Sequence, residues 1–546
     1  MKSRGVLVSR RQGLKAALAA GASTALGAFA SVPAAQAQSR AETLRQVMGG
    51  TLNSLDATAP GSTREVFGLA MNVYDRLASF GRKQVNGYWI FDFDTIRGEL
   101  AEKIDRSADG RTLTFHLRQG ARWHDGTPVM AADVKWSLDR AVSAKSLSAA
   151  QLSTGSLVKP EQFRVVGDGV IEVSLERPDR LALANLCIPL APMFNSTLAK
   201  KNATTEDPWA QSWLKENTAA GGAYMVESHK PGQQTILKRN DDWKNGVDGK
   251  LPFFRRIIAQ TVPEAATRAS LLEKGDADLS IDLQSSDIDP LVQRGKVKLV
   301  AIPQTNGFTA IVFNTRMAPF DNVKVRQAIA AALPYEDMFK AALFGRGRKL
   351  FGADWSEAPN DSFPQPLPLR TDLAKAKALL AEAGFANGFA TSFAFAAGAA
   401  AAAEPAAALL KEALAKIGIE VSIQKMPDAQ LATMEVERRL PFFLETGTAW
   451  LPAPDYFLRT YFNGDQRWNF SSFKDDELDR LVQAARFETD PAKYAAMCRQ
   501  MITIVGRQDP ALMLWQPNQD AVMAPNVDGF TYWFHRQVDY RDLRRS

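Results

Sequence analysis

The chain has 546 residues, of which 46% are apolar and 23% are charged. This composition is typical of folded globular proteins, and the length is sufficient for two or three domains with cores of their own. The formal net charge of +6 would on its own favour a nucleic-acid-binding protein. Residues 1–37, however, contain five basic residues and no acidic residue, so the remainder carries a net charge of only +1. We therefore expect no nucleic-acid partner.

The N-terminus has the pattern of a cleavable export signal. Basic residues are followed by an Ala/Gly/Leu-rich run over 16–30 and by small residues that end at 35–37. This order predicts a signal peptide over 1–37, and the apolar run is too short and too rich in alanine and glycine for a membrane anchor. The pair Arg10-Arg11 resembles a twin-arginine signal, but Gly13 stands where that pattern has Phe, so both export routes stay open. We expect a soluble, periplasmic mature protein.

The chain contains two cysteines, Cys187 and Cys498, in apolar contexts far apart in the sequence. An oxidising compartment permits a disulfide between them. Isolated cysteines in apolar contexts are more often buried and free, so we expect two free thiols, with a disulfide as the alternative. Neither cysteine lies near the cleavage site, which argues against a lipid anchor.

Apolar side chains alternate between the spacing of strands and that of helices. They occupy every second position over 113–117 and 419–423, which predicts half-buried strands there. Three predicted helices follow an aspartate that can cap a helix, namely Asp372, Asp475 and Asp490. The mixture predicts an α/β protein.

A glycine and a proline also predict two helix boundaries. Gly506 is predicted to end the helix that begins after Asp490. The alanine-rich stretch 399–408 is predicted to enter a helix that opens at Glu404-Pro405, because proline is favoured at the first helical position.

Several segments resemble one protein family, in the same order and with the same spacing. They are Asp109–Arg140, Ala220–Tyr224, Arg239–Trp243, Phe313–Ala328, Asp372–Phe385 and Leu414–Val421. These segments are similar to the family 5 bacterial extracellular solute-binding proteins, the peptide- and nickel-binding receptors of ABC importers. The resemblance extends over essentially the whole mature chain. It implies a two-lobed periplasmic-binding-protein fold with mixed sheets, connected by a hinge, with an extra subdomain in lobe one.

The resemblance also implies an organisation and a function. Lobe one is expected over 38–305 and again over 508–546, and lobe two over 306–507. The receptor would capture a peptide or other small polar solute by hinge closure, without a cofactor and without breaking a bond. Its partners would be the ligand and the ABC permease subunits of the inner membrane, and we expect a monomer.

A catalytic or metal site has little support in the sequence. His124-Asp125 is the only pairing that favours general-base chemistry, yet Gly126 and Pro128 beside it are typical of a structural turn. The four histidines include no pair at metal-ligand spacing on a helix, so we expect no metal site. A secreted hydrolase that uses His124 and Asp125 is the alternative from another class.

Trp450 is the leading candidate for ligand contact. It lies in a segment similar to the family's Trp-x-x-Asp-x-x-Asp-Pro cleft motif, in which an Asp binds the amino group of a peptide. Here Ala453 stands at the first acidic position, and Asp455 either faces the ligand or caps the following helix. The departure leaves open an opine, a sugar or a chelated metal as the ligand instead of a peptide.

Other candidates lie on loops and on predicted crossing strands. Arg346 and Arg348, in a Gly-flanked loop, suit a ligand carboxylate or belong to a solvated loop. Gly221 and Gly222 permit close backbone approach to a ligand or form an ordinary tight turn. Trp515 and Gln516, which follow a predicted strand, are expected to face the cleft from lobe one, and Asn314 either faces the cleft or serves the hinge.

Overall fold

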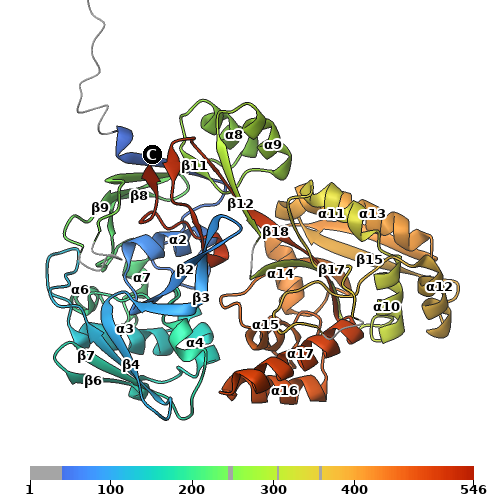
Figure 1. Ribbon diagram of the computed structural model, residues 1–546, viewed down its shortest axis with the longest axis horizontal. Coiled ribbons are helices and arrows are strands. Elements are labelled where there is room, and N and C mark those ends of the chain that lie inside the picture. Colours follow the sequence, from blue (N-terminus) through green and yellow to red (C-terminus); the bar gives the residue numbers. More distant parts are fainter. Residues whose placement is uncertain (1–39, 244–249, 304–305, 356–358) are drawn as a thin grey trace, which may run out of the picture.

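The computed structural model describes residues 40–243, 250–303, 306–355 and 359–546. The predicted signal peptide over 1–37 lies outside these residues. The chain forms two lobes that meet at a narrow crossing region (Figure 1). The N-terminal half and the C-terminal end form lobe one, and the segment between them forms lobe two, so the predicted two-lobed α/β fold is confirmed. None of the helices within the described ranges has the length and apolar character needed to cross a membrane.

A mixed sheet of twelve strands runs through both lobes. In lobe one its strands are β1 (Thr43–Met48), β8 (Tyr224–Lys230), β9 (Gln234–Arg239), β10 (Arg256–Thr261), β11 (Leu279–Ser280) and β12 (Lys298–Pro303). In lobe two they are β13 (Gly307–Phe313), β14 (Gly347–Lys349), β15 (Phe389–Ala396), β16 (Ile419–Met426) and β17 (Phe442–Thr448), and both lobes share β18 (Ala511–Met523). The order is β16-β15-β17-β13-β18-β11-β1-β10-β9-β8, with β12 and β14 also paired to β18.

The long strand β18 connects the two lobes. Its first part, up to Pro517, pairs with β13 and β14 of lobe two, and its second part, from Asn518, pairs with β12 and β11 of lobe one. The apolar side chains of 511–515 are all buried, as befits the middle of a sheet. Residues 511–517 pair within lobe two, and the chain pairs with lobe one only from Asn518. The predicted lobe boundary at residue 508 stays a prediction.

Lobe one carries three further sheets, the smallest of which pairs β19 (Val527–Asp528) with β21 (Arg544–Arg545). Another is antiparallel, in the order β4-β5-β7-β6, with β4 (Ala101–Arg106), β5 (Thr112–Leu117), β6 (Phe163–Gly167) and β7 (Val170–Ser174). Inward side chains of β5 alternate with half-buried ones, as predicted for 113–117, and pack with α3 in a core separate from the main one. This unit is the predicted extra subdomain. The third sheet comprises β2 (Ala78–Val85), β3 (Tyr88–Gly98) and β20 (Thr531–Tyr532).

Helices cover the sheets in both lobes. Those of lobe one are α2 (Arg64–Val73), α3 (Ala131–Ser143), α4 (Leu147–Leu152), α5 (Ala182–Asn185), α6 (Ser196–Lys201), α7 (Gln211–Leu214), α8 (Ala265–Glu273) and α9 (Ser285–Gln293). Those of lobe two are α10 (Val323–Ala332), α11 (Tyr335–Leu343), α12 (Leu373–Glu382), α13 (Ala400–Ala415), α14 (Asp428–Val436), α15 (Pro454–Phe462), α16 (Asp476–Phe487) and α17 (Pro491–Gln508). The three predicted capping aspartates accept hydrogen bonds from the first turns of α12, α16 and α17, which confirms them.

Two predicted helix boundaries are wrong. The helix α17 continues past Gly506 to Gln508, and Asp509 adopts the left-handed conformation that ends it. Gly506 serves packing instead, because a Cβ there would lie 2.4 Å from the ring of Trp355. The helix α13 begins at Ala400, before Pro405, because alanine has the highest helix propensity and the run before the proline supplies a full first turn.

Candidate ligand-binding site

A cavity of about 430 Å³ lies between the lobes, and we call it the inter-lobe cavity. Lobe one lines it with Lys83, Ile90, Phe91, Phe93, Asp94 and Arg180, and lobe two lines it with Asp361, Ser362, Pro452, Ala453, Pro454 and Tyr494. The volume falls within the range of about 300–1,000 Å³ typical of small-molecule sites. Apolar walls with a few charged groups are also typical of such sites.

The walls of the inter-lobe cavity come from rigid elements. The aromatic side chains Phe91 and Phe93 belong to β3, whose residues 88–92 and 96–98 pair with β2 on either side of an irregularity that contains Phe93. On the facing lobe, Pro454 occupies the first turn of α15, where its fixed φ suits a helix start. Both walls are therefore ordered before any ligand is bound.

Two charged groups of the inter-lobe cavity come from opposite lobes. The Arg180 guanidinium of lobe one lies over the ring of Tyr494, 3.5 Å from its centroid, and 3.5 Å from the Asp455 carboxylate. The Tyr494 hydroxyl donates a 2.5 Å hydrogen bond to that same carboxylate, so buried Asp455 is already engaged within the protein. Asp361 of lobe two is exposed and forms no ion pair with any residue of the described ranges. The inter-lobe cavity therefore offers a cation on one side and a free carboxylate on the other.

Trp450 itself does not line the inter-lobe cavity, although it precedes the lining residue Pro452 by two positions in the chain. Its ring stacks on His535 of lobe one, with centroids 3.7 Å apart, and meets Phe67 of α2 edge-on at 4.8 Å. Burial, together with the positive charge of Arg64, lowers the pKa of His535 well below its usual value, so the imidazole is neutral. The stack therefore joins the two lobes through apolar and aromatic contact.

The C-terminal segment that carries His535 contains further buried polar groups. Within the part of the chain that the structure describes, Nε2 of His535, Nε1 of Trp533 and both amide atoms of Gln537 and Gln519 have no hydrogen-bond partner. Buried polar groups in proteins are normally paired, so a group of unpaired ones in one segment is unusual. The sequence analysis missed these side chains, because no local pattern marks them.

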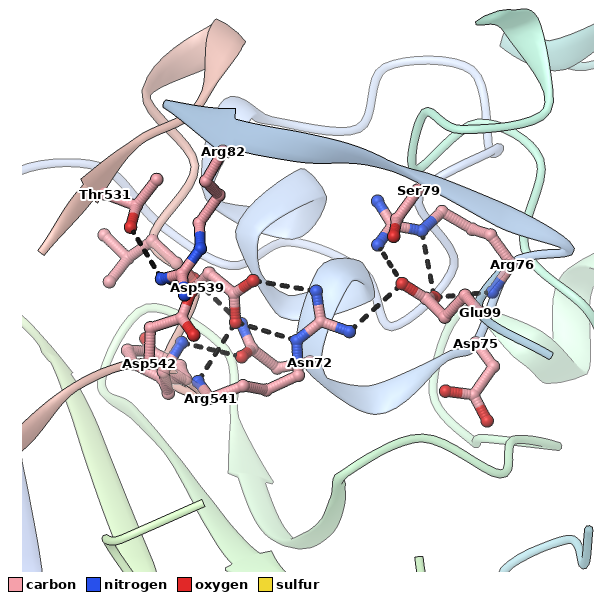
Figure 2. A network of polar contacts seen from close by, with 12 residues as sticks. Asn72, Asp75, Arg76, Ser79, Arg82, Glu99, Thr531, Asp539, Arg541 and Asp542 are labelled. Atoms are coloured by element: carbon pink, nitrogen blue, oxygen red, sulfur yellow. Dashed lines mark hydrogen bonds and ion pairs between the residues drawn. The ribbon is translucent and has the colours of Figure 1, made fainter. Parts of the chain in front are cut away.

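The end of the chain fixes this segment in place (Figure 2). Arg541 forms ion pairs with Asp539 at 2.7 Å and with Glu99 at 3.2 Å, and Glu99 also pairs with Arg76 at 2.6 Å. Burial alone would raise the pKa of Glu99, but Arg76 and Arg541 hold it below the usual value. These buried charges bind the chain end to Glu99, in the turn between β3 and β4, and through it to Arg76, in the loop that follows α2.

Two glutamates of lobe two, Glu435 and Glu445, lie close enough to lobe one to feel the charge of Arg64. Burial raises the pKa of Glu445 on β17 well above its usual value, and the neighbouring carboxyl of Glu435 adds to the shift. The positive charge of Arg64, from α2 of lobe one, opposes it. The pair therefore holds a proton that two isolated glutamates would have lost.

The other predicted site residues lie away from the inter-lobe cavity. Arg346 forms ion pairs with Asp520 of β18 and Asp289 of α9, at 2.7 and 2.9 Å, and thus ties the two lobes together at the crossing strands. Arg348 donates to Oε1 of Gln516, whose Nε2 donates to the Gly307 carbonyl.

The remaining candidates are held in the interior of the protein. Asn314 donates to the Arg438 carbonyl, and Trp515 is buried beside Phe339. A Cβ on Gly221 would meet Trp123, and one on Gly222 would meet the backbone of α2, so both glycines permit close packing.

The alternative catalytic pair has the geometry of a turn. Nε2 of His124 lies 3.0 Å from the Gly222 carbonyl, and burial lowers the pKa of His124. Asp125 accepts hydrogen bonds from Thr127 and Asn195. These contacts account for both side chains without a substrate.

Cysteine and metal predictions can also be compared with the structure. Cys187 and Cys498 are buried free thiols, which confirms that prediction. Burial raises the pKa of both, that of Cys498 to about 12, so neither is a reactive thiolate.

Among the described residues, no group of three or more His, Cys, Asp or Glu side chains is placed to hold a metal ion.

Known proteins with similar sequences and folds are binding proteins. The chain is 26% identical over 441 residues to the probable D,D-dipeptide-binding periplasmic protein of Escherichia coli, covering 80% of this chain and 82% of that one. In fold it is similar to a periplasmic binding protein of Helicobacter pylori in complex with the peptide STSA, with a TM-score of 0.75, 21% identity and coverage of 94% and 99%. It is also similar to NikA from Brucella suis in complex with Fe(III)-EDTA, with a TM-score of 0.77, 20% identity and coverage of 92% and 100%.

A family model shows the relationship directly. The model for bacterial extracellular solute-binding proteins, family 5, matches residues 95–469, which is more than half of the chain. The match runs from the end of β3 to beyond α15, and it includes the extra subdomain and the segment that contains Trp450. The resemblance noted in the sequence is therefore confirmed, and the chain belongs to the family 5 bacterial extracellular solute-binding proteins of ABC importers.

Proposed function

We propose that this protein is a periplasmic receptor that captures a short peptide between its lobes and delivers it to the permease subunits of an ABC importer. The observation that carries the proposal is the inter-lobe cavity, whose walls come from both lobes. A ligand in it would touch lobe one and lobe two at once, so binding energy would favour closure. The leader over 1–37 would direct export, and the receptor would act as a monomer and break no bond.

A peptide suits the charges of the inter-lobe cavity. Its ammonium and carboxylate groups would pair with Asp361 of lobe two and Arg180 of lobe one. Ala453 supplies no carboxylate at the position where the family motif has one, and Asp361 would replace it from a neighbouring loop. The apolar side chain of the peptide would pack against Phe91 and Phe93. Peptides and a D,D-dipeptide appear in the names of the similar proteins, which supports this ligand class.

The test combines ligand identification with one variant. Mass spectrometry of the protein purified from periplasm should reveal a bound peptide, and isothermal titration calorimetry should then give its dissociation constant. We expect Trp450→Ala to raise that constant at least tenfold, because the variant removes the aromatic stack between the lobes, while the melting temperature changes little. Trp468→Ala, on the exposed surface of lobe two, is the matched control. An unchanged constant for Trp450→Ala, or turnover of the ligand, would refute the proposal.

A further inference from the structure

A second contact between the lobes lies apart from the inter-lobe cavity. Helices α15 and α16 of lobe two meet the end of α4 and the short helix η1 (Ser153–Gly155) of lobe one (Figure 1). The lobe-two side chains in this contact are Tyr456, Arg459 and Arg486, and we call them the latch. None of them lines the inter-lobe cavity.

Two members of the latch form buried hydrogen bonds to lobe one. The Tyr456 hydroxyl lies 2.9 Å from Oε1 of Gln151 and donates to it. Nη2 of Arg459 donates to the Thr154 carbonyl at 3.1 Å. Tyr456, Gln151 and Arg459 are all buried, so water competes poorly for these bonds when the lobes are closed.

Arg486 makes the most extensive contact of the latch. Its Nε lies 3.2 Å from Oδ2 of Asp179, and its Nη2 donates to the Ser153 carbonyl at 2.9 Å and to the Ser156 hydroxyl at 3.1 Å. The Asp179 carboxylate is fully buried. A buried ion pair with additional hydrogen bonds is strongly destabilised when one partner is removed. Arg486 is thus the member whose loss should matter most.

Lobe one holds the acceptors in place without help from lobe two. Nε2 of Gln151 donates to Oδ1 of Asn185 at 2.8 Å, which leaves Oε1 of Gln151 turned toward Tyr456. Oδ1 of Asp179 accepts from the Leu181 amide, and Oδ2 accepts from the Ser156 hydroxyl at 2.6 Å. Ser156 is in the left-handed conformation, at φ 63°, which a serine adopts only when its surroundings enforce it. The receiving surface is therefore formed in advance.

We propose that the latch closes the lobes in the absence of ligand, so that Tyr456, Arg459 and Arg486 act as positioning residues that set ligand affinity without touching the ligand. This inference rests on the proposed capture by lobe closure. The apparent dissociation constant rises as the fraction of closed receptor falls. A receptor that is largely closed beforehand therefore needs fewer contacts with its ligand, which suits the capture of peptides with different side chains.

The test measures closure without ligand. The protein is freed of bound ligand by reversible unfolding in guanidinium chloride and dialysis, and its radius of gyration is measured by small-angle X-ray scattering. We expect the wild type to give the radius of the closed form, and the triple variant Tyr456→Phe, Arg459→Gln, Arg486→Gln to give a larger one. Circular dichroism should show that both are folded, so that the larger radius of the variant reports opening of the lobes.

Two further variants complete the design. Arg486→Gln alone changes one partly exposed side chain and should shift the radius in the same direction. Arg480→Gln on the same helix is the matched control and should behave as the wild type. Among the described residues, the Arg480 guanidinium donates only to the Asp476 carbonyl of its own helix. Equal radii for the wild type and the triple variant would overturn the latch. This result is independent of ligand identity and so leaves the proposed function to its own test.

Discussion

The C-terminal segment has two parts that differ in how their buried polar groups are satisfied. Residues 538–545 place Asp539 and Arg541 in a network where each charge has a partner (Figure 2). Residues 531–537 place Trp533, His535 and Gln537 in the interior with side-chain atoms that have no partner among the described residues. The first part anchors the chain end, and the second lies against Trp450 of the other lobe.

The difference concerns the stability of the fold. A buried charge that has lost its partner costs several kcal/mol, so a satisfied network holds its segment firmly. A buried amide or imidazole without a partner among the described residues contributes no such bond to the fold. Neighbouring parts of one segment thus differ in how much their side chains contribute to holding the chain in place.

The largest effect is expected when the anchoring network is broken. Arg541→Gln would leave Asp539 and part of Glu99 without their cation, so we expect the free energy of unfolding to fall by about 3 kcal/mol. Chemical denaturation in urea measures this change. The control is Arg544→Gln, at an exposed position, which should change stability by less than about 0.5 kcal/mol. Equal stabilities of the two variants would contradict the role assigned to the network.

The cost of a buried charge without a partner can also be tested at an acid outside this segment. Burial raises the pKa of Asp509 to about 7, and its Oδ1 has no partner among the described atoms. The folded state therefore keeps a proton that the unfolded state loses, and stability should fall as the pH rises from about 4 to about 7. Asp509→Asn keeps the left-handed conformation and removes the charge. We expect it to stabilise the protein at pH 8, where the wild type must bury a charge, and to have little effect at pH 4.

Thermal unfolding across this pH range measures the difference between the two proteins. The control is Asp476→Asn, in the exposed first turn of α16, which should not change the slope of stability with pH. A gain from Asp509→Asn that is the same at pH 4 and pH 8 would show that the charge is not its source.

The smallest effect is expected in the unpaired part of the C-terminal segment. Gln537→Leu replaces a fully buried amide that has no partner among the described atoms with an apolar side chain of similar size. Since no protein hydrogen bond is lost, the free energy of unfolding should change by less than about 1 kcal/mol. Urea denaturation beside Arg541→Gln makes the comparison, and a loss as large as that of Arg541→Gln would remove the distinction between the two parts.

Local signals in the sequence predicted much of the fold. The aspartates that precede α12, α16 and α17 cap these helices because a short acidic side chain can reach the free amides of the first turn. The end of α17 was misplaced because Gly506 suits a helix end equally well, and only the approach of Trp355 explains why that position is glycine. Contacts between distant segments decide such cases.

Less of the candidate site than of the fold could be predicted from the sequence. The motif around Trp450 contributes Pro452, Ala453 and Pro454 to the lining of the inter-lobe cavity, and the placement of the ligand there stays a prediction. The facing groups Arg180 and His535 come from segments far away in the chain, and no local pattern marks them. Arg346 was proposed for a ligand carboxylate, but Asp289 and Asp520 already neutralise it, and both pairings arise only when the chain is folded.

The strand β18 has a consequence for dividing the molecule. Residues 511–517, which follow α17, form the strand of lobe two that lies between β13 and β14. The residues that come directly after them pair with β12 of lobe one. A fragment that stops at residue 507 would expose one full edge of β13 to solvent and to neighbouring chains. The two lobes are therefore distinct in shape, but neither can be expressed without the strand that they share. A fragment that ends at residue 507 should aggregate instead of folding into an isolated lobe.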